Sequence, residues 1–321
     1  MINFHSVLGY AVSQTGSQTF LGLKEPKYGP WDIAILPIPL EITTSWKEGT
    51  AMGPNACLEV SSQVELYDEL LENELPCGLS FHTSIPWSSD EGTLEKQLDS
   101  IKEYVKPWTN GKQFPLILGG EHGILLPIIE SLSDNSKINY LQDLTIVQID
   151  AHADLRNELN GEKFSHGTVV RRCLDSGVGK VIQIGVRAFN KEEFEIINND
   201  VRVDTWFARD LFGLRNKNKT WAKLLNKIEE LRGPIWLTFD IDGLDSSLVP
   251  STGTPMPGGL SYWQAIELIE KLFFADGTEI IGADINEINQ GGIDSLTEFN
   301  AALIATKIVA CQTFLIRAQK D

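Results

Sequence analysis

Short apolar runs alternate with amphipathic segments along most of the chain. Each run is followed by turn-forming residues, which is typical of buried strands, at about 32–38, 79–83, 114–118, 144–149, 180–185, 201–206, 234–239 and 279–285. Helical patterns lie between them, at about 54–71, 93–105, 124–132, 191–199, 221–231 and 295–310. The alternation predicts an α/β fold in which about eight parallel strands are covered by helices on both faces. Because no repeat or linker divides the chain, we expect a single domain over 31–321, preceded by an irregular arm over 1–30.

Potential metal ligands follow three of the predicted strands. Two of these groups place their ligands at alternate positions, and alternate side chains of an extended chain point the same way. The carboxyl ends of parallel strands meet at one edge of a sheet. The candidate ligands are His122, Asp150, His152, Asp154, Asp240 and Asp242. Each group alone also fits a solvated acidic turn or a loop histidine, but together they predict one metal site.

The charge of this set favours two metal ions over one. Four carboxylates and two neutral imidazoles carry a charge of -4, which two divalent cations cancel. Ligation by mostly oxygen, with some nitrogen, suits Mn²⁺ better than Zn²⁺. Two such ions about 3.5–4 Å apart generate a nucleophilic hydroxide at neutral pH. The spacing therefore predicts metal-assisted hydrolysis.

The composition and charge of the chain restrict the kinds of partner that it can bind. The chain has 321 residues with 42% hydrophobic and 22% charged residues, an ordinary globular balance. Its formal net charge of -17 argues against nucleic acid or an anionic membrane, and suits a small cationic substrate. Four widely spaced cysteines indicate free thiols in a reducing compartment. We see no signal-peptide pattern and no apolar run near the roughly 20 residues of a membrane span, so we expect a cytoplasmic protein.

Six motifs together resemble the ureohydrolase (arginase/agmatinase) family. They occur in family order over about residues 30–310, as G-G-E-H (119–122), D-A-H-A-D (150–154), S-H-G-T (165–168), D-I-D-G-L-D (240–245), T-G-T-P-M-P-G-G-L (252–260) and N-E-I-N (286–289). The resemblance implies a three-layer, arginase-like fold with a mostly parallel eight-stranded sheet. It also implies two Mn²⁺ per subunit, with Ni²⁺ as an alternative, and a homo-oligomer, either a trimer or a hexamer.

The resemblance further assigns a role to each site residue. It implies that Asp150 and Asp240 bridge the two metals, that His122 and Asp154 complete one metal, and that His152 and Asp242 complete the other. Three residues receive catalytic roles, namely Asp154, His166 and Glu287. Asp154 would orient the bridging hydroxide, Glu287 would pair with the guanidinium group, and His166 would shuttle a proton. Without the resemblance, a surface histidine and a loop glutamate are the simpler interpretations of His166 and Glu287.

Details of the motifs favour agmatinase over arginase. The segment 155–166 and the residues after Arg187 lack the side chains with which arginases hold an α-amino acid. The resemblance therefore implies hydrolysis of agmatine to putrescine and urea, a step of polyamine biosynthesis. Gly123, Gly243 and Gln290 depart from the family pattern. The last two leave 4-guanidinobutanoate, 3-guanidinopropanoate, guanidine and, less favoured, arginine as alternative substrates.

Three other classes compete with this interpretation. A deacetylase of the same fold needs one zinc and fewer of these ligands. A non-catalytic regulatory homologue would have lost a ligand or an acid/base residue, and none is lost. A structural metal site would be closed by its protein ligands, whereas six ligands for two metals leave open positions.

Overall fold

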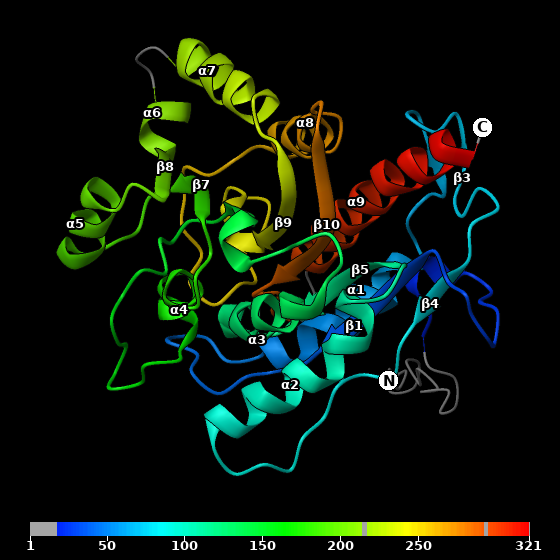
Figure 1. The fold of residues 1–321 in the computed structure, drawn as a ribbon, viewed down its shortest axis with the longest axis horizontal. Helices are drawn as coiled ribbons and strands as arrows, with labels where there is room; N and C mark the ends of the chain where they lie inside the picture. Colours follow the sequence, from blue (N-terminus) through cyan, green and yellow to red (C-terminus); the bar gives the residue numbers. More distant parts are fainter. Residues whose placement is uncertain (1–17, 214–216, 292–294, 321) are drawn as a thin grey trace, which may run out of the picture.

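A parallel sheet of eight strands forms the centre of the molecule (Figure 1). The structure is a computed structural model that describes residues 18–213, 217–291 and 295–320. The strands are β1 (Ile33–Ile38), β4 (Phe81–Thr83), β5 (Phe114–Gly119), β6 (Thr145–Ile149), β7 (Lys180–Val186), β8 (Val203–Phe207), β9 (Gly233–Asp240) and β10 (Thr278–Asn286). Their order is β4-β1-β5-β10-β9-β6-β7-β8, and every neighbouring pair is parallel. The predicted α/β fold is confirmed.

Helices cover both faces of this sheet. One face carries α1 (Gly53–Ser61), α7 (Lys217–Glu229), α8 (Tyr262–Phe273) and α9 (Leu296–Lys320), whose apolar side chains share one core cluster. The other face carries α2 (Leu94–Thr109), α3 (Leu125–Ser131) and α4 (Val169–Asp175) over a second cluster. Figure 1 shows α2, α3 and α4 on the opposite side of the sheet from α8 and α9. The short α5 (Lys191–Asn199) and α6 (Ala208–Phe212) flank β8. Burial on both faces explains why the central strands are continuous apolar runs.

We expect the core of β9 to be sensitive to cavity formation. Leu237 is fully buried in the cluster beneath α8 and α9. Leu237→Ala should lower the free energy of unfolding by about 2–5 kcal/mol, because the cavity collapses only partly. Val201→Ala is the control, since Val201 is 99% exposed and should change stability by no more than about 0.5 kcal/mol. Chemical denaturation measures both, and equal stabilities would contradict the assigned packing.

One predicted helix is much shorter than expected. The sequence pattern predicted a helix over 54–71, but α1 ends at Ser61 and the chain then forms an antiparallel pair, β2 (Tyr67–Asp68) with β3 (Asn73–Glu74). The hydroxyls of Ser61 and Ser62 donate back to the carbonyls of Leu58 and Glu59. Such side-chain bonds compete with the helix and favour its end.

The predicted N-terminal arm is partly built into the core. Residues 1–17 of this arm lie outside the described residues. Beyond them, Phe20 is fully buried and Leu21 nearly so. The Phe20 amide donates to the hydroxyl of Thr83, and the Leu21 amide donates to that of Ser61. The end of the arm is therefore fixed to β4 and α1.

The C-terminal helix corrects one expectation from the sequence. We expected no apolar run near the length of a membrane span, but α9 has 25 residues and, among the described residues, is the one helix long and apolar enough for a span. However, 61% of its most apolar window is buried inside the protein. It contacts α1, α8 and the sheet. Its apolar character is explained by its place as a core helix.

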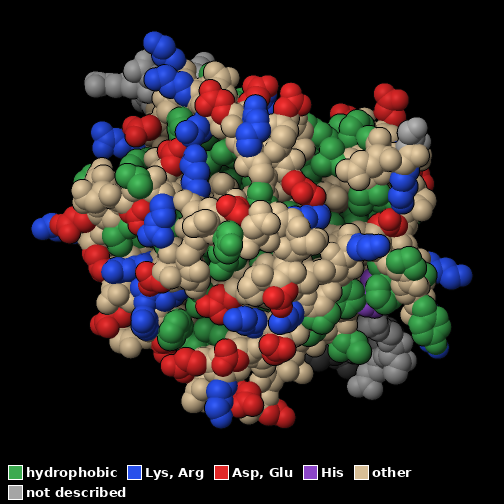
Figure 2. Space-filling view, in the orientation of Figure 1, with side chains coloured by type: hydrophobic (Ala, Val, Ile, Leu, Met, Phe, Trp, Pro, Cys, Tyr) green, Lys and Arg blue, Asp and Glu red, His purple; other side chains and the backbone are tan. Residues whose placement is uncertain are grey.

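The negative charge of the protein is not gathered in one patch on the face seen in Figure 2. Acidic and basic side chains are interspersed there, although the chain carries a net charge of -17. Interspersed charges attract a cationic molecule only weakly at physiological salt. On this face, therefore, surface charge does not mark a binding place for a cation.

Candidate metal centre and active site

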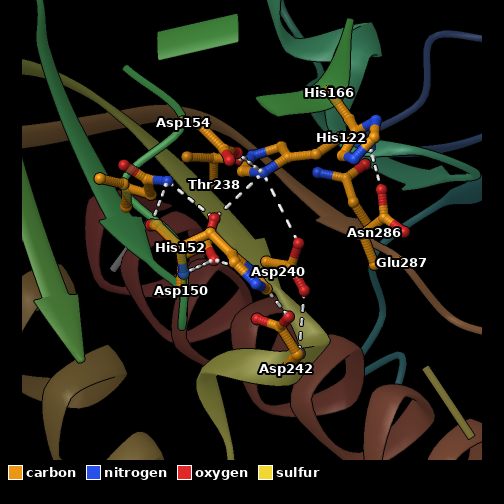
Figure 3. Close-up of polar contacts among 12 residues, drawn as sticks. His122, Asp150, His152, Asp154, His166, Thr238, Asp240, Asp242, Asn286 and Glu287 are labelled. Atoms are coloured by element: carbon orange, nitrogen blue, oxygen red, sulfur yellow. Dashed lines mark hydrogen bonds and ion pairs between the residues drawn. The ribbon is translucent and has the colours of Figure 1, made fainter. Parts of the chain in front are cut away.

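The predicted ligands and Glu287 meet at the carboxyl ends of four adjacent strands, β5, β10, β9 and β6 (Figure 3). His122 opens a short helical turn just after β5, and Asp150 follows β6 directly. Asp240 is the last residue of β9, and Glu287 follows β10. The strand order thus brings together side chains that lie far apart in sequence.

His122 faces three carboxylates. Its Nδ1 lies 3.0 Å from Asp154 Oδ2, 3.2 Å from Asp150 Oδ2 and 3.7 Å from Asp240 Oδ2. All four side chains are buried. Buried carboxylates packed this closely repel one another unless positive charge lies among them.

His152 forms a second group that shares Asp150 with the first. Its Nδ1 lies 3.0 Å from Asp242 Oδ2 and 3.6 Å from Asp150 Oδ1. The potential ligand atoms of His122, Asp150 and Asp240 all lie within 4.8 Å of one another, as do those of Asp150, His152 and Asp242. Two neighbouring sets with a common carboxylate have the arrangement that a binuclear centre needs.

The hydrogen bonds around His122 show that this site fits metal ions. The Thr238 hydroxyl donates to Asp284 Oδ2 at 2.6 Å, so its oxygen accepts a hydrogen bond from His122 Nε2 at 2.8 Å. The proton of the neutral imidazole is therefore on Nε2. Nδ1 is buried, has no hydrogen-bond partner, and points its lone pair at the carboxylates. A lone pair aimed at negative oxygens needs a metal cation or a proton between them, and an outer hydrogen bond of this kind commonly fixes the tautomer of a metal-binding histidine.

The local electrostatics agree with this arrangement. Burial lowers the pKa of His122, but Asp150 and Asp154 outweigh burial and raise it well above its ordinary value. Burial, reinforced by Asp150, raises the pKa of Asp154 to about 7. Burial together with Asp242 and Asp150 raises the pKa of Asp240 well above its usual range. The cluster thus strongly favours added positive charge, which divalent metals supply.

Removal of bound metal should therefore destabilise the protein. A ligand present at 100 times its Kd stabilises the folded state by about 2.7 kcal/mol, and each kcal/mol corresponds to about 2–4 °C in Tm for chains of this size class. We expect chelation to lower Tm by roughly 5–10 °C and added Mn²⁺ to restore it. Differential scanning fluorimetry with metal analysis measures this. An unchanged Tm after verified metal removal would contradict metal binding by the cluster.

Two of the site residues have unusual backbone conformations. The φ angles of Asp154 and Glu287 are 53° and 62°, in the left-handed region that non-glycine residues rarely adopt. The expected period of two therefore does not by itself bring Asp154 to the cluster. The chain is extended as far as His152, which forms a bridge with Ala188, and the turn at Asp154 directs its carboxylate toward His122.

Glu287 and His166 lie beside the cluster, as Figure 3 shows. Glu287 Oε1 accepts a hydrogen bond of 2.8 Å from the amide of His122, and burial raises the pKa of Glu287 to about 8. His166 begins a helical turn before α4. Burial, with the neighbouring His152 and His122, lowers the pKa of His166 to about 4, so its ring is neutral at pH 7.

A cavity of about 220 Å³ connects these groups to the surface. Its inner wall includes ligands from both metal groups together with Glu287 and His166. Its outer wall includes Trp46, Arg156, Leu159 and Ala188. All the predicted catalytic residues therefore line one cavity, and of the predicted ligands only Asp150 lies behind its wall.

Residues 31–311 match the family described as the arginase family. The chain belongs to the arginase family. It is 30% identical over 288 residues to the N(1)-aminopropylagmatine ureohydrolase of Synechocystis, covering 88% of this chain and 89% of that protein. It is 32% identical over 266 residues to an agmatinase of Bacillus anthracis, covering 82% and 85%. A crystal structure of a putative agmatinase from Clostridium difficile superposes with a TM-score of 0.77 at 26% identity, over 89% and 98% of the two chains.

This membership confirms the family predicted from the motifs. As an arginase-family ureohydrolase of the agmatinase-like kind, the protein is a metal-dependent amidinohydrolase. The three-layer α/β fold is likewise that of the family. The deacetylase alternative is therefore set aside.

Several polar residues of this arginase-family site were missed by the sequence analysis. Thr238 and Asp284 orient His122, and the Gln148 amide donates to Asp150 Oδ2 at 2.7 Å. The signal was present, because each residue interrupts an otherwise apolar central strand. A buried polar group needs a partner, so such an interruption predicts a hydrogen-bonding role even before the partner is known.

The three departures from the family pattern have different structural settings. At Gly243, an added Cβ would lie 2.8 Å from Ile149 Cγ2 and 2.9 Å from the amide of Asp150, so a side chain would displace a metal-ligand backbone. At Gly123, a Cβ would lie 3.3 Å from Glu121 Oε1. Gln290 is exposed and does not line the cavity.

Proposed function

We propose that this protein hydrolyses agmatine to putrescine and urea, using two Mn²⁺ ions held by His122, Asp150, His152, Asp154, Asp240 and Asp242. The observation that carries the proposal is the single cavity in which ligands of both metal groups meet Glu287 and His166. The names of relatives that are about 30% identical, agmatinases and aminopropylagmatine ureohydrolases, support a guanidino substrate.

The side chains divide the work in the following way. When bound by these ligands, two divalent metals would supply Lewis-acid activation of water for attack on the guanidinium carbon. Glu287 has one oxygen held by the His122 amide, which leaves the other to pair with the planar guanidinium cation. A bound cation also keeps Glu287 ionised, against the effect of burial on its pKa. His166, neutral at pH 7, accepts a proton from the attacking water and transfers it to the leaving amine.

The outer wall suits an alkyl chain. Trp46, Leu159 and Ala188 present apolar atoms to the cavity. Arg156 is the cation of this wall, and its Nε lies 3.8 Å from the buried carboxylate of Glu193. The two charges largely cancel, so an ammonium tail is not repelled strongly.

N(1)-aminopropylagmatine is a second candidate substrate. One relative of 30% identity carries that name. Trp46, at the cavity wall, is 76% exposed, so a longer tail would extend past it without steric obstruction from this side chain. The same guanidinium site would serve both substrates.

Urea release by the manganese-loaded protein tests the proposal. The panel contains agmatine, N(1)-aminopropylagmatine, arginine, 4-guanidinobutanoate, 3-guanidinopropanoate and guanidine, with nickel loading in parallel. The highest kcat/KM on agmatine supports the proposal. A preference for an acid-tailed compound would show that Arg156 recruits a carboxylate, and no urea from any compound with two metals bound would contradict the proposal.

Manganese as the native metal, the homo-oligomer and the cytoplasmic location stay predictions. Metal analysis of protein purified without added metal distinguishes manganese from nickel. Sedimentation velocity distinguishes a trimer from a hexamer. Fractionation of the source cells tests the location.

A further inference from the structure

Hydroxyl groups contact both ring nitrogens of His166. Thr43 Oγ1 lies 2.9 Å from Nδ1, and Ser45 Oγ lies 2.9 Å from Nε2. Both hydroxyls come from the loop between β1 and α1. Each hydroxyl has one proton to donate, so the direction of each bond depends on the other neighbours of that hydroxyl.

The other neighbours of Thr43 fix its direction. Thr43 Oγ1 lies 3.1 Å from Glu121 Oε1 and accepts a hydrogen bond of 3.1 Å from the amide of His166. Burial raises the pKa of Glu121, but the amides of Ile42 and Thr43 donate to this carboxylate and favour its ionised form. An ionised carboxylate only accepts, so the single proton of Thr43 goes to Glu121. His166 Nδ1 must then be the donor to Thr43. The neutral ring therefore carries its proton on Nδ1, and Nε2 accepts from Ser45.

Glu121 is held rigidly as an acceptor. It is fully buried, and its Oε2 accepts hydrogen bonds from the amides of Ile42 and Thr43, at 3.0 and 2.7 Å. These two bonds tie the carboxylate to the loop that carries both hydroxyls. Gly123 lies next to Oε1 but has no side chain that could donate to it. Among the described residues, the side chain that donates a hydrogen bond to Oε1 is therefore the hydroxyl of Thr43.

We propose that Glu121, acting through the hydroxyl of Thr43, is a positioning residue that holds His166 with its proton on Nδ1 and its lone pair on Nε2. The inference rests on the proposed function, in which His166 transfers a proton. With Nδ1 occupied, a proton taken up at Nε2 gives the imidazolium, and its loss from Nε2 to the leaving amine restores the starting tautomer. Neither Glu121 nor Thr43 contacts the substrate in this scheme.

Glu121→Gln is the sharpest test, because it keeps the shape and reverses one hydrogen bond. The amide oxygen would accept from Ile42 and Thr43, and the amide nitrogen would donate to Thr43 Oγ1. The Thr43 proton would turn to His166 Nδ1 and move the ring proton to Nε2. We expect kcat to fall by about 10²–10⁴-fold, the range of general acid–base catalysis, with a smaller change in KM and two metals retained.

Substitutions at Thr43 separate the hydroxyl from the bulk of the side chain. Thr43→Val should lower kcat by about 10²-fold or more, whereas Thr43→Ser should retain most of it. Thr313→Val is the matched control, since Thr313 is a buried threonine of α9 whose hydroxyl has no hydrogen-bond partner. Wild-type kcat in Glu121→Gln or Thr43→Val would overturn the proposal. A loss of bound metal large enough to explain the lower kcat would also overturn the proposal, because Glu121 would then act by holding the metal ligand His122 in place.

Nitrogen NMR of ¹⁵N-histidine-labelled, zinc-loaded protein reads the tautomer without turnover. We expect a protonated Nδ1 on His166 in the wild type and a protonated Nε2 in Glu121→Gln, with His166→Asn identifying the signals. A wild-type ring protonated on Nε2 would overturn the inference. If the wild type instead shows the Nδ1 tautomer but releases no urea from any guanidino compound, the proposed function fails while the hydrogen-bond assignment stands.

Discussion

Asp154→Asn is expected to lower kcat by about 10³-fold or more, the largest effect of any single isosteric change in the cluster. Asp154 Oδ2 lies 3.0 Å from His122 Nδ1, and its side chain is almost fully buried. Asparagine preserves the shape but removes one of four negative charges. It also offers a neutral amide where a metal ligand and an oriented acceptor for water are needed. We therefore expect weaker binding of one metal together with the loss of turnover.

Urea release and metal content, measured on the same Asp154→Asn sample, separate these two effects. Asp90→Asn serves as the control, because Asp90 is exposed and does not line the cavity. Turnover like that of the wild type at matched manganese occupancy would exclude a catalytic role for Asp154. If excess manganese fully restores turnover, the role of Asp154 is limited to binding the metal.

Glu287→Gln is expected to retain both metals and to lose most activity. The glutamine oxygen replaces Glu287 Oε1 as acceptor for the His122 amide, which lies 2.8 Å away, so the backbone beside the metals stays in place. The charge that pairs with the guanidinium is lost. Removing one partner of a desolvated charge pair costs about 2–5 kcal/mol, which lowers kcat/KM by about 30- to 5,000-fold.

Metal stoichiometry decides how a loss of activity in Glu287→Gln is interpreted. Two ions per subunit with impaired kcat/KM support the pairing of Glu287 with the substrate. Fewer than two ions would make Glu287 a ligand or a structural support. Glu230→Gln controls for the loss of one negative charge, because Glu230 is exposed and directly follows α7.

The strand ends that carry the candidate ligands were easier to predict from the sequence than the order of the strands in the sheet. Ligands such as His122 and Asp240 follow short apolar runs, and a run of that kind is a reliable sign of a buried parallel strand. These ligands then come together because the carboxyl ends of parallel strands lie at the same edge of the sheet. The strand order could not be predicted in this way, because β10, near the end of the chain, lies between β5 and β9. No local pattern encodes which distant strands become neighbours.

Other features depended on contacts that a local pattern does not contain. The helix predicted over 54–71 failed because serine side chains bond back to the backbone at the end of α1. The link from Glu121 through Thr43 to His166 joins three segments. Asp284 was visible in the sequence as a charge in an apolar strand, but its partners Thr238 and Trp236 come from β9. Buried polar groups can therefore be detected from the sequence, but their roles become clear only when the order of the strands is known.

The left-handed backbone at Asp154 and Glu287 implies a conflict between stability and function. Each non-glycine residue in this region costs of order 1–3 kcal/mol, a cost that glycine would largely remove. Glycine at these positions would also remove buried carboxylates whose charge is unfavourable without bound cations. In the absence of bound metal, selection for a more stable chain alone would therefore replace both residues. A library selected for thermal resistance in the presence of a chelator should therefore lose these two side chains early, whereas one selected with metal present should keep Asp154.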